Sequence, residues 1–136
     1  MISVLHVDDD QDILDIGKIF LERSGQITVT TAPDASGAIR LLQAQEYDAI
    51  ISDYHMPGMD GMSFLMFVRS RYGNLPFIFF SGVESREVFN DAIRNGADAF
   101  CLKGSGIPAV QFRELEYTVV QAVSGRWKEE LSVSGE

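Results

Sequence analysis

Short apolar runs alternate with longer segments of helical periodicity along the chain, and this order constrains the fold more than any other feature. The runs predicted as strands are residues 2–7, 27–31, 48–52, 76–80 and 98–102. Apolar residues at helical spacing follow each of them, a pattern typical of a helix with one buried face. Because consecutive parallel strands need a helix-length connection, this order predicts a three-layer α/β fold: a parallel sheet with helices on both faces.

The apolar stripes of the helices predict which residues pack on the sheet. The first and fourth stripes consist of Ile13, Ile16, Gly17, Phe20 and Leu21, and of Val88, Phe89, Ala92 and Ile93. Ser24-Gly25 and Asn95-Gly96 mark the ends of these two helices, since glycine favours a helix C-terminus.

Length and charge exclude several classes of protein. The chain has 136 residues, which suits one domain. Its formal net charge is −9, so phosphate backbones and anionic lipid would repel it, and we expect neither direct nucleic-acid binding nor membrane association. Cys101, the lone cysteine, lies in an apolar run, and no apolar segment approaches the length of a membrane span. These features indicate a cytoplasmic protein.

Polar side chains follow four of the five predicted strands. They are Asp8-Asp9-Asp10, Asp53, Ser81 and Lys103. In open parallel sheets the ligand site lies outside the carboxyl ends of the strands, so we expect these groups to converge. Several converging carboxylates repel one another unless a hard divalent cation such as Mg²⁺ binds them.

Metal, ammonium and hydroxyl are also the groups that phosphoryl transfer requires, because its catalysis consists mainly of positioning and charge neutralisation. Each residue has an ordinary interpretation when it is considered alone. Asp10 is interpreted as the N-cap of the first helix, Lys103 as a solvated lysine, Ser81 as a turn residue and His6 as a strand residue. Only their joint placement favours a functional site.

Two segments, residues 4–10 and 47–61, resemble the receiver domain of two-component response regulators. The resemblance continues through residues 76–82 and 95–103 and covers about residues 2–123. It implies a flavodoxin-like fold with strand order 2-1-3-4-5 and a receiver domain over residues 1–123. Residues 124–136 are then a C-terminal tail or the start of a linker helix.

The resemblance also implies a role for each matched residue. Asp53 would be the phospho-acceptor, and Mg²⁺ or Mn²⁺ would bind Asp8, Asp9, Asp53 and the backbone carbonyl of His55. Ser81 would hydrogen-bond the phosphoryl group, Lys103 would pair with a phosphoryl oxygen, and Phe100 would be the aromatic switch. A sensor histidine kinase or a phosphotransfer protein would be the phosphoryl donor. The domain would catalyse only its own phosphorylation and dephosphorylation, and a homodimer could form on phosphorylation.

Three positions depart from the family pattern. Gly104 replaces the usual proline after the lysine, Gly82 replaces a common alanine, and Phe100 replaces the more frequent tyrosine. Without proline a cis bond costs about 2.5–4 kcal/mol. The alternatives are a trans Lys103–Gly104 bond, with Gly104 adopting dihedrals closed to other residues, and a strained cis bond held by the metal and phosphoryl site, and we predict the trans bond. Lys103 is still expected to reach Asp53, because its stem is flexible.

The stretches 103–108 and 111–115 are similar to receivers attached to sensory modules in methanogenic archaea. This second resemblance implies the N-terminal receiver of an archaeal hybrid sensory protein. Residues 125–131 would then begin a connecting helix, and the alternative interpretation is a frayed terminus.

Parts of the sequence also suggest two other functions. Asp8-Asp9-Asp10 has the Asp-x-Asp spacing of haloacid-dehalogenase-type phosphatases, in which Asp8 would be the nucleophile. The chain is short for a capped phosphatase, and that function leaves the match around Asp53 unexplained. A mononucleotide- or flavin-binding module would need an anion cradle after the first strand, where three aspartates would repel phosphate.

Overall fold

Strand and helix alternate five times along the chain, as the apolar pattern predicts. The computed structural model describes residues 1–104 and 106–135, with side chains up to residue 125. The strands are β1 (Ile2–Val7), β2 (Ile27–Ala32), β3 (Ala49–Ser52), β4 (Phe77–Ser81) and β5 (Ala99–Leu102). The helices are α1 (Gln11–Glu22), α2 (Ala35–Ala44), α3 (Gly61–Tyr72), α4 (Arg86–Arg94) and α5 (Pro108–Gly135).

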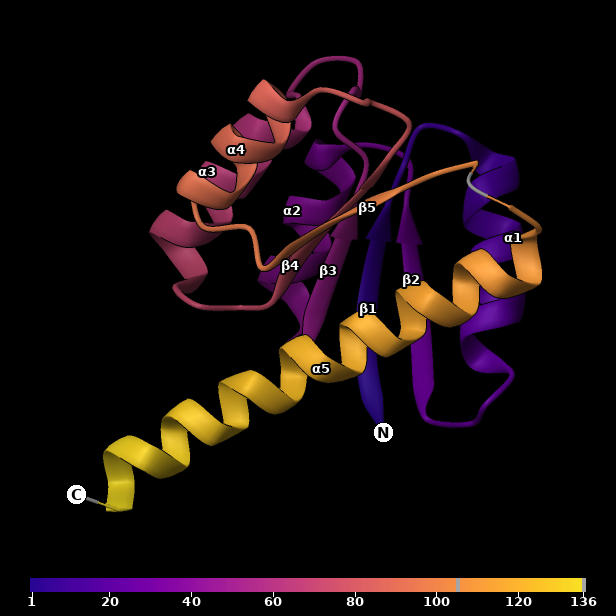
Figure 1. Ribbon diagram of the computed structural model, residues 1–136. Coiled ribbons are helices and arrows are strands. Elements are labelled where there is room, and N and C mark those ends of the chain that lie inside the picture. Colours follow the sequence, from indigo (N-terminus) through magenta and orange to yellow (C-terminus); the bar gives the residue numbers. More distant parts are fainter. Residues whose placement is uncertain (105, 136) are drawn as a thin grey trace.

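All five strands are parallel and form one sheet in the order β2-β1-β3-β4-β5. Helices α1 and α5 cover one face of this sheet, and α2, α3 and α4 cover the other (Figure 1). The predicted three-layer flavodoxin-like fold and its strand order are therefore confirmed. The order reverses between β1 and β3, so the loops after these two strands meet at one edge of the sheet.

The two faces of the sheet bury separate apolar clusters. Leu5, Ile50 and Phe79 belong to the cluster under α2, α3 and α4. Val4 and Ile51 belong to the cluster under α1 and α5. Every residue of β3 and β4 is buried, which explains why these strands appear in the sequence as continuous apolar runs. Their rigid packing fixes the positions of the residues that follow them.

Side chains cap the helices that begin at the carboxyl edge of the sheet. Asp10 precedes α1, and its Oδ1 accepts hydrogen bonds from the backbone N–H groups of Asp12 (3.0 Å) and Ile13 (3.4 Å). The interpretation of Asp10 as an N-cap is thus confirmed. Asp60 caps α3 in the same way, by accepting from the Ser63 N–H at 2.8 Å.

Some of the predicted boundaries and buried faces are wrong in detail. The third and fifth strands begin one residue later than predicted, at Ala49 and Ala99, and the fourth is shifted by one to Phe77–Ser81. In α1, Leu14 is buried and Ile16 is 38% exposed. In α4 only Ala92 is buried, whereas Phe89 and Ile93 are 45% and 41% exposed. Helical spacing identifies an apolar stripe, but it cannot tell which part of the stripe a neighbouring element covers.

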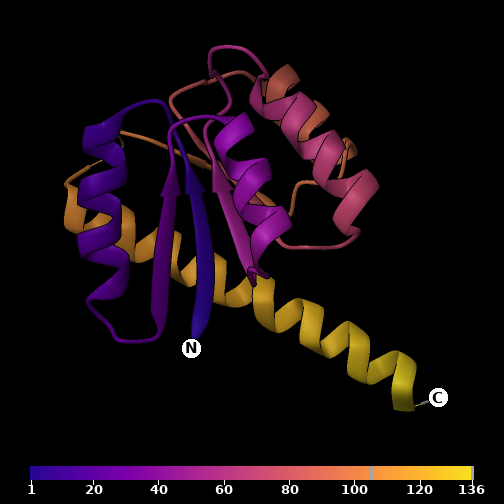
Figure 2. The same ribbon diagram turned by 180° about the vertical axis from the view of Figure 1, so that it is seen from behind.

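Helix α5 crosses the face of the sheet and continues as one helix to Gly135. Its C-terminal part projects away from the sheet (Figure 2). Among the described residues, no helix has the length and apolarity needed to span a membrane.

Candidate phosphoryl-acceptor site

Three carboxylates meet at the carboxyl edge of the sheet. Asp8 and Asp9 follow β1 and Asp53 follows β3, and one carboxylate oxygen from each lies within 4.8 Å of the other two. Asp8 and Asp53 are buried and Asp9 is exposed. Oxygen ligands of this kind suit Mg²⁺ or Mn²⁺, and the exposed Asp9 leaves one side of the cluster open to solvent.

Lys103 neutralises part of this charge from the end of β5. Its Nζ lies 2.6 Å from Asp8 Oδ2 and 3.2 Å from Asp53 Oδ2. Burial alone would lower the pKa of Lys103, but the pairs with Asp8 and Asp53 outweigh it and raise that pKa. Burial raises the pKa of Asp8, while Lys103 and the Asp10 N–H oppose that shift. A charged ammonium therefore lies between the Asp8 and Asp53 carboxylates.

The backbone around Lys103 supports this reach. The Lys103 N–H donates to the Ser81 carbonyl at 2.9 Å, which ties the end of β5 to the end of β4. The Lys103–Gly104 bond is trans, and Gly104 has a φ of 78°. Residues with a Cβ rarely adopt that dihedral, so both parts of the prediction for this bond are confirmed.

Asp53 is held by backbone groups on both sides. Its N–H donates to the Val7 carbonyl at 2.9 Å, and its Oδ1 accepts from the Tyr54 N–H at 2.8 Å. The Asp53 side chain is 11% exposed, so the carboxylate is fixed but still accessible from the open edge. A carboxylate in this setting can act as a nucleophile toward a phosphoryl group that approaches from solvent.

The remaining predicted residues lie around this cluster. Ser81 ends β4, is 1% exposed, and its Oγ accepts from the Val83 N–H at 3.4 Å. Phe100 lies in the neighbouring strand β5, with its ring 5.5 Å from that of Phe79. His55 is an exposed residue of the loop after Asp53. The roles of these three residues remain predictions.

Gly61 directly follows the cap of α3 and has a role that no sequence pattern predicted. A Cβ at Gly61 would overlap the Asp53 carbonyl oxygen and would lie 2.8 Å from both a Phe79 ring carbon and the Tyr54 Cα. The Gly61 N–H donates to the Tyr54 carbonyl at 2.8 Å. Glycine is therefore needed for the start of α3 to approach the backbone of Asp53 and Tyr54 so closely.

We expect Gly61→Ala to lower the free energy of unfolding by about 1–3 kcal/mol, because the added methyl group would overpack rigid backbone. Gly82→Ala is the matched control, since a Cβ there would meet nothing within 4 Å. Denaturant unfolding of both variants checks the prediction. Equal stabilities would show that the start of α3 can move away from Asp53 at little cost.

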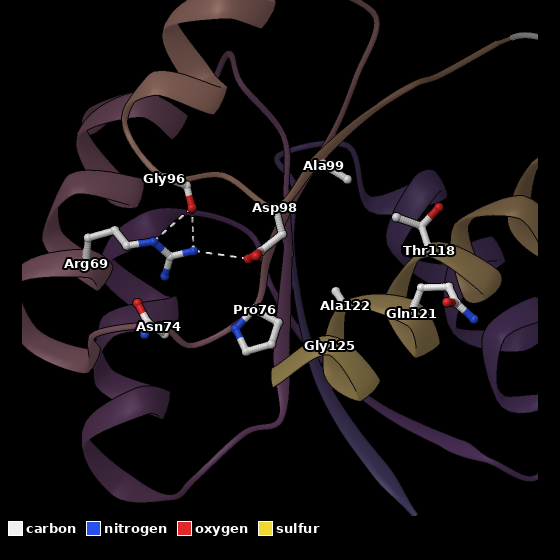
Figure 3. Close-up of a pocket in the computed structure, with 10 residues that line it drawn as sticks. All are labelled: Arg69, Asn74, Pro76, Gly96, Asp98, Ala99, Thr118, Gln121, Ala122 and Gly125. Atoms are coloured by element: carbon white, nitrogen blue, oxygen red, sulfur yellow. Dashed lines mark hydrogen bonds and ion pairs between the residues drawn. The ribbon is translucent and has the colours of Figure 1, made fainter. Parts of the chain in front are cut away.

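A pocket of about 560 Å³ lies at the end of the sheet opposite the carboxylate cluster, and Figure 3 shows the residues that line it. Arg69 is its main charged group, and its five N–H donors are already engaged. They donate to the carbonyls of Gly73, Leu75 and Gly96 and to Asp98 Oδ2. Arg69 thus joins the end of α3 to the loops before β4 and β5, which is a structural role.

Comparison with known proteins identifies the family of this chain. The model of the response regulator receiver domain matches residues 4–111. The chain belongs to the receiver-domain family. Response regulator Rre1 of Synechocystis is 36% identical to this receiver over 107 residues, which is 75% of this chain and 45% of Rre1. The receiver domain of the Francisella response regulator 1452 superposes with a TM-score of 0.83 at 30% identity, covering 93% of this chain and 99% of that one.

This receiver spans less than half the length of several response regulators that it matches. The putative two-component response regulator ARR21 of Arabidopsis thaliana is 35% identical over 104 residues, which is 75% of this chain but 16% of ARR21. The family identifies the chain as a phosphorelay signalling domain and gives no support to a phosphatase that uses Asp8. In the structure Asp8 is completely buried, which is a poor setting for a nucleophile.

Proposed function

We propose that this receiver accepts a phosphoryl group on the carboxylate of Asp53 and changes conformation in response. The observation that carries the proposal is the position of that carboxylate. It directly follows a fully buried strand, is paired with Lys103 and lies within 4.8 Å of Asp8 and Asp9 oxygens. This arrangement supports Asp53 as the nucleophile, Lys103 as its adjacent cation, and Asp8 and Asp9 as metal ligands.

In the proposed reaction, an Asp53 oxygen attacks the phosphorus of a phosphohistidine on a partner. A P–O bond forms, the P–N bond breaks, and its electron pair returns to the imidazole. Lys103 stabilises the charge on the phosphoryl oxygens from its place beside Asp53. Ser81 donates a hydrogen bond to the phosphoryl group, and hydrolysis of the acyl phosphate later resets the switch.

Asp8, Asp9, Asp53 and the His55 carbonyl are proposed to bind Mg²⁺ or Mn²⁺. The metal would supply positive charge to the phosphoryl oxygens. The acidic, oxygen-only character of the cluster fits such an ion. The ion would also relieve the repulsion among carboxylates that Lys103 only partly compensates.

The donor is proposed to be a sensor histidine kinase or a phosphotransfer protein in the cytoplasm. The receiver is proposed to act as a switch whose only chemistry is its own phosphorylation and dephosphorylation. We also propose that it forms a homodimer on phosphorylation. For residues 124–136 the alternatives are a C-terminal tail and the start of a linker helix, and the helix is supported by α5, which passes residue 123 without a break and continues to Gly135. The proposal that the chain is the N-terminal receiver of an archaeal hybrid protein rests on the sequence resemblance alone.

Transfer of a phosphoryl group from acetyl phosphate to the protein, measured in the presence of magnesium, tests the proposed function. By intact-mass analysis we expect one added phosphoryl group on the wild type and none on Asp53→Asn. Asp15→Asn, which changes an exposed aspartate of α1, is expected to behave like the wild type. Equal uptake by Asp53→Asn and the wild type would contradict the proposal.

Magnesium binding has a separate test in thermal stability. A cation that binds only the folded state raises the melting temperature by mass action, so we expect magnesium to stabilise the wild type. Asp9→Asn should greatly reduce that shift, while Asp15→Asn should retain it. An unchanged shift in Asp9→Asn, measured by thermal unfolding with and without magnesium, would remove Asp9 from the ligand set.

A further inference from the structure

Four aromatic rings connect the acceptor loop to the surface of α4. Tyr54 directly follows Asp53, and its ring centroid lies 5.7 Å from that of Phe79. The Phe79 and Phe100 centroids are 5.5 Å apart, and Phe100 lies 6.2 Å from Phe89 of α4. These separations are within the range of favourable aromatic pairs, so the rings form a continuous path from β3 to α4.

Tyr54 is bound to the acceptor through its backbone. Its N–H donates to Asp53 Oδ1 at 2.8 Å, and its carbonyl accepts from the Gly61 N–H at 2.8 Å. Conversion of the Asp53 carboxylate to an acyl phosphate would change the charge and the position of the oxygens that this N–H can reach. A change at the Asp53 carboxylate is therefore transmitted directly to the backbone of Tyr54, while the hydrogen bond from Gly61 of α3 restrains that backbone from the other side.

The middle of the path cannot absorb a displacement of the Tyr54 ring. Phe79 is completely buried, and its ring also packs against Phe77 at 5.1 Å. Close-packed interiors transmit strain because they contain few voids into which a ring can move. A shift of the Tyr54 ring is therefore passed to Phe100 in the next strand.

The far end of the path is free to respond. Phe89 and Phe100 line a groove of about 800 Å³ between α4, β5 and the loop after β4. Phe89 is 45% exposed, and Ala92 is the one buried residue of α4, so this helix is held by little apolar contact. A lightly packed element of this kind can adopt a second position at low cost.

From these contacts we infer that Tyr54 is a positioning residue, which couples the state of Asp53 to the position of α4 through the rings of Phe79 and Phe100. This inference rests on the proposed function of Asp53. It assigns to Tyr54 a route that does not pass through the hydroxyl of Ser81. The ring carries the coupling and the phenol oxygen does not, because each contact in the path is between rings.

Fluorine NMR of the full chain tests the coupling, with 4-fluorophenylalanine at Phe89 and beryllium fluoride with magnesium as the phosphoryl mimic. In the wild type and in Tyr54→Phe, saturation with the mimic should shift the Phe89 resonance. In Tyr54→Ala the mimic should still bind, with at least half of that shift lost. Phe67→Ala, which removes a ring that pairs with Tyr72 elsewhere, should keep the full shift.

A double-mutant cycle supplies a second readout that a merely structural role would not move. Because coupling is reciprocal, Phe89→Ala should change the affinity of the wild type for the mimic by about fivefold. In the Tyr54→Ala background the same substitution should change it by less than about twofold. If Tyr54→Ala proves unfolded by circular dichroism, Tyr54→Leu takes its place in both experiments.

The outcomes separate this inference from the proposed function. A full Phe89 shift in Tyr54→Ala at saturating mimic, or additive effects in the cycle, would overturn the role of Tyr54 and leave the acceptor role of Asp53 intact. Failure of the wild type to bind the mimic would overturn both.

Discussion

Lys103→Met should lower the free energy of unfolding by about 2–4 kcal/mol when no divalent metal is present, because it leaves a buried carboxylate without its partner. Lys103 Nζ lies 2.6 Å from Asp8, whose side chain is completely buried. A second substitution, Asp8→Asn, should recover most of the loss because it removes the uncompensated charge. Urea unfolding of the single and double variants measures both effects.

Lys18→Met provides the control for Lys103→Met. Lys18 pairs with Glu22 on the surface of α1, where an ion pair contributes less than about 1 kcal/mol, and its ammonium also donates to the Val29 carbonyl at 2.7 Å. Magnesium should restore part of the stability of Lys103→Met, since the cation and the lysine neutralise the same carboxylates. A Lys103→Met protein as stable as Lys18→Met would show that the ammonium does not compensate Asp8.

Acid should destabilise this receiver through His6, a second large effect. Burial, with a smaller contribution from Lys103, lowers the pKa of His6 from 6.5 to about 3. The unfolded chain takes up a proton as pH falls through 6.5, whereas the folded protein does so only near pH 3. The stability that His6 contributes is therefore fully present above pH 6.5 and decreases toward pH 3, by about 3–5 kcal/mol in total.

His6→Leu should flatten the dependence of unfolding free energy on pH between 6.5 and 3. Ile51→Val, which changes a buried residue that has no titratable group, should keep the slope of the wild type. His6 lies beneath Gly17, where a Cβ would come within 3.1 Å of its ring, and neither ring nitrogen has a hydrogen-bond partner among the described residues. Parallel profiles for His6→Leu and the wild type would show that His6 does not cause the acid sensitivity.

The sequence was sufficient to predict the fold and the convergence of the site. Continuous apolar runs identified β3 and β4, because both strands are buried on both faces. The rule that ligand sites lie at the carboxyl ends of parallel strands then brought Asp8, Asp53 and Lys103 together, and the structure confirms that they meet.

Features that depend on three-dimensional packing could not be predicted from spacing. Lys103 lies closer to Asp8 than to Asp53, at 2.6 Å and 3.2 Å, and the spacing of these residues in the sequence does not encode that difference. Phe89 and Ile93 have the spacing of core residues, yet α4 leaves both partly exposed. The close approach of Gly61 to Asp53 joins residues whose contact no periodicity reveals.

The location of the phosphoryl group tests the central claim most directly. The receiver would be phosphorylated with acetyl phosphate and magnesium, the acyl phosphate reduced with borohydride, and the modified aspartate found by peptide mass spectrometry. We predict modification at Asp53 alone. Modification at Asp8, with Asp53 intact, would contradict the account and would identify Asp8 as the nucleophile.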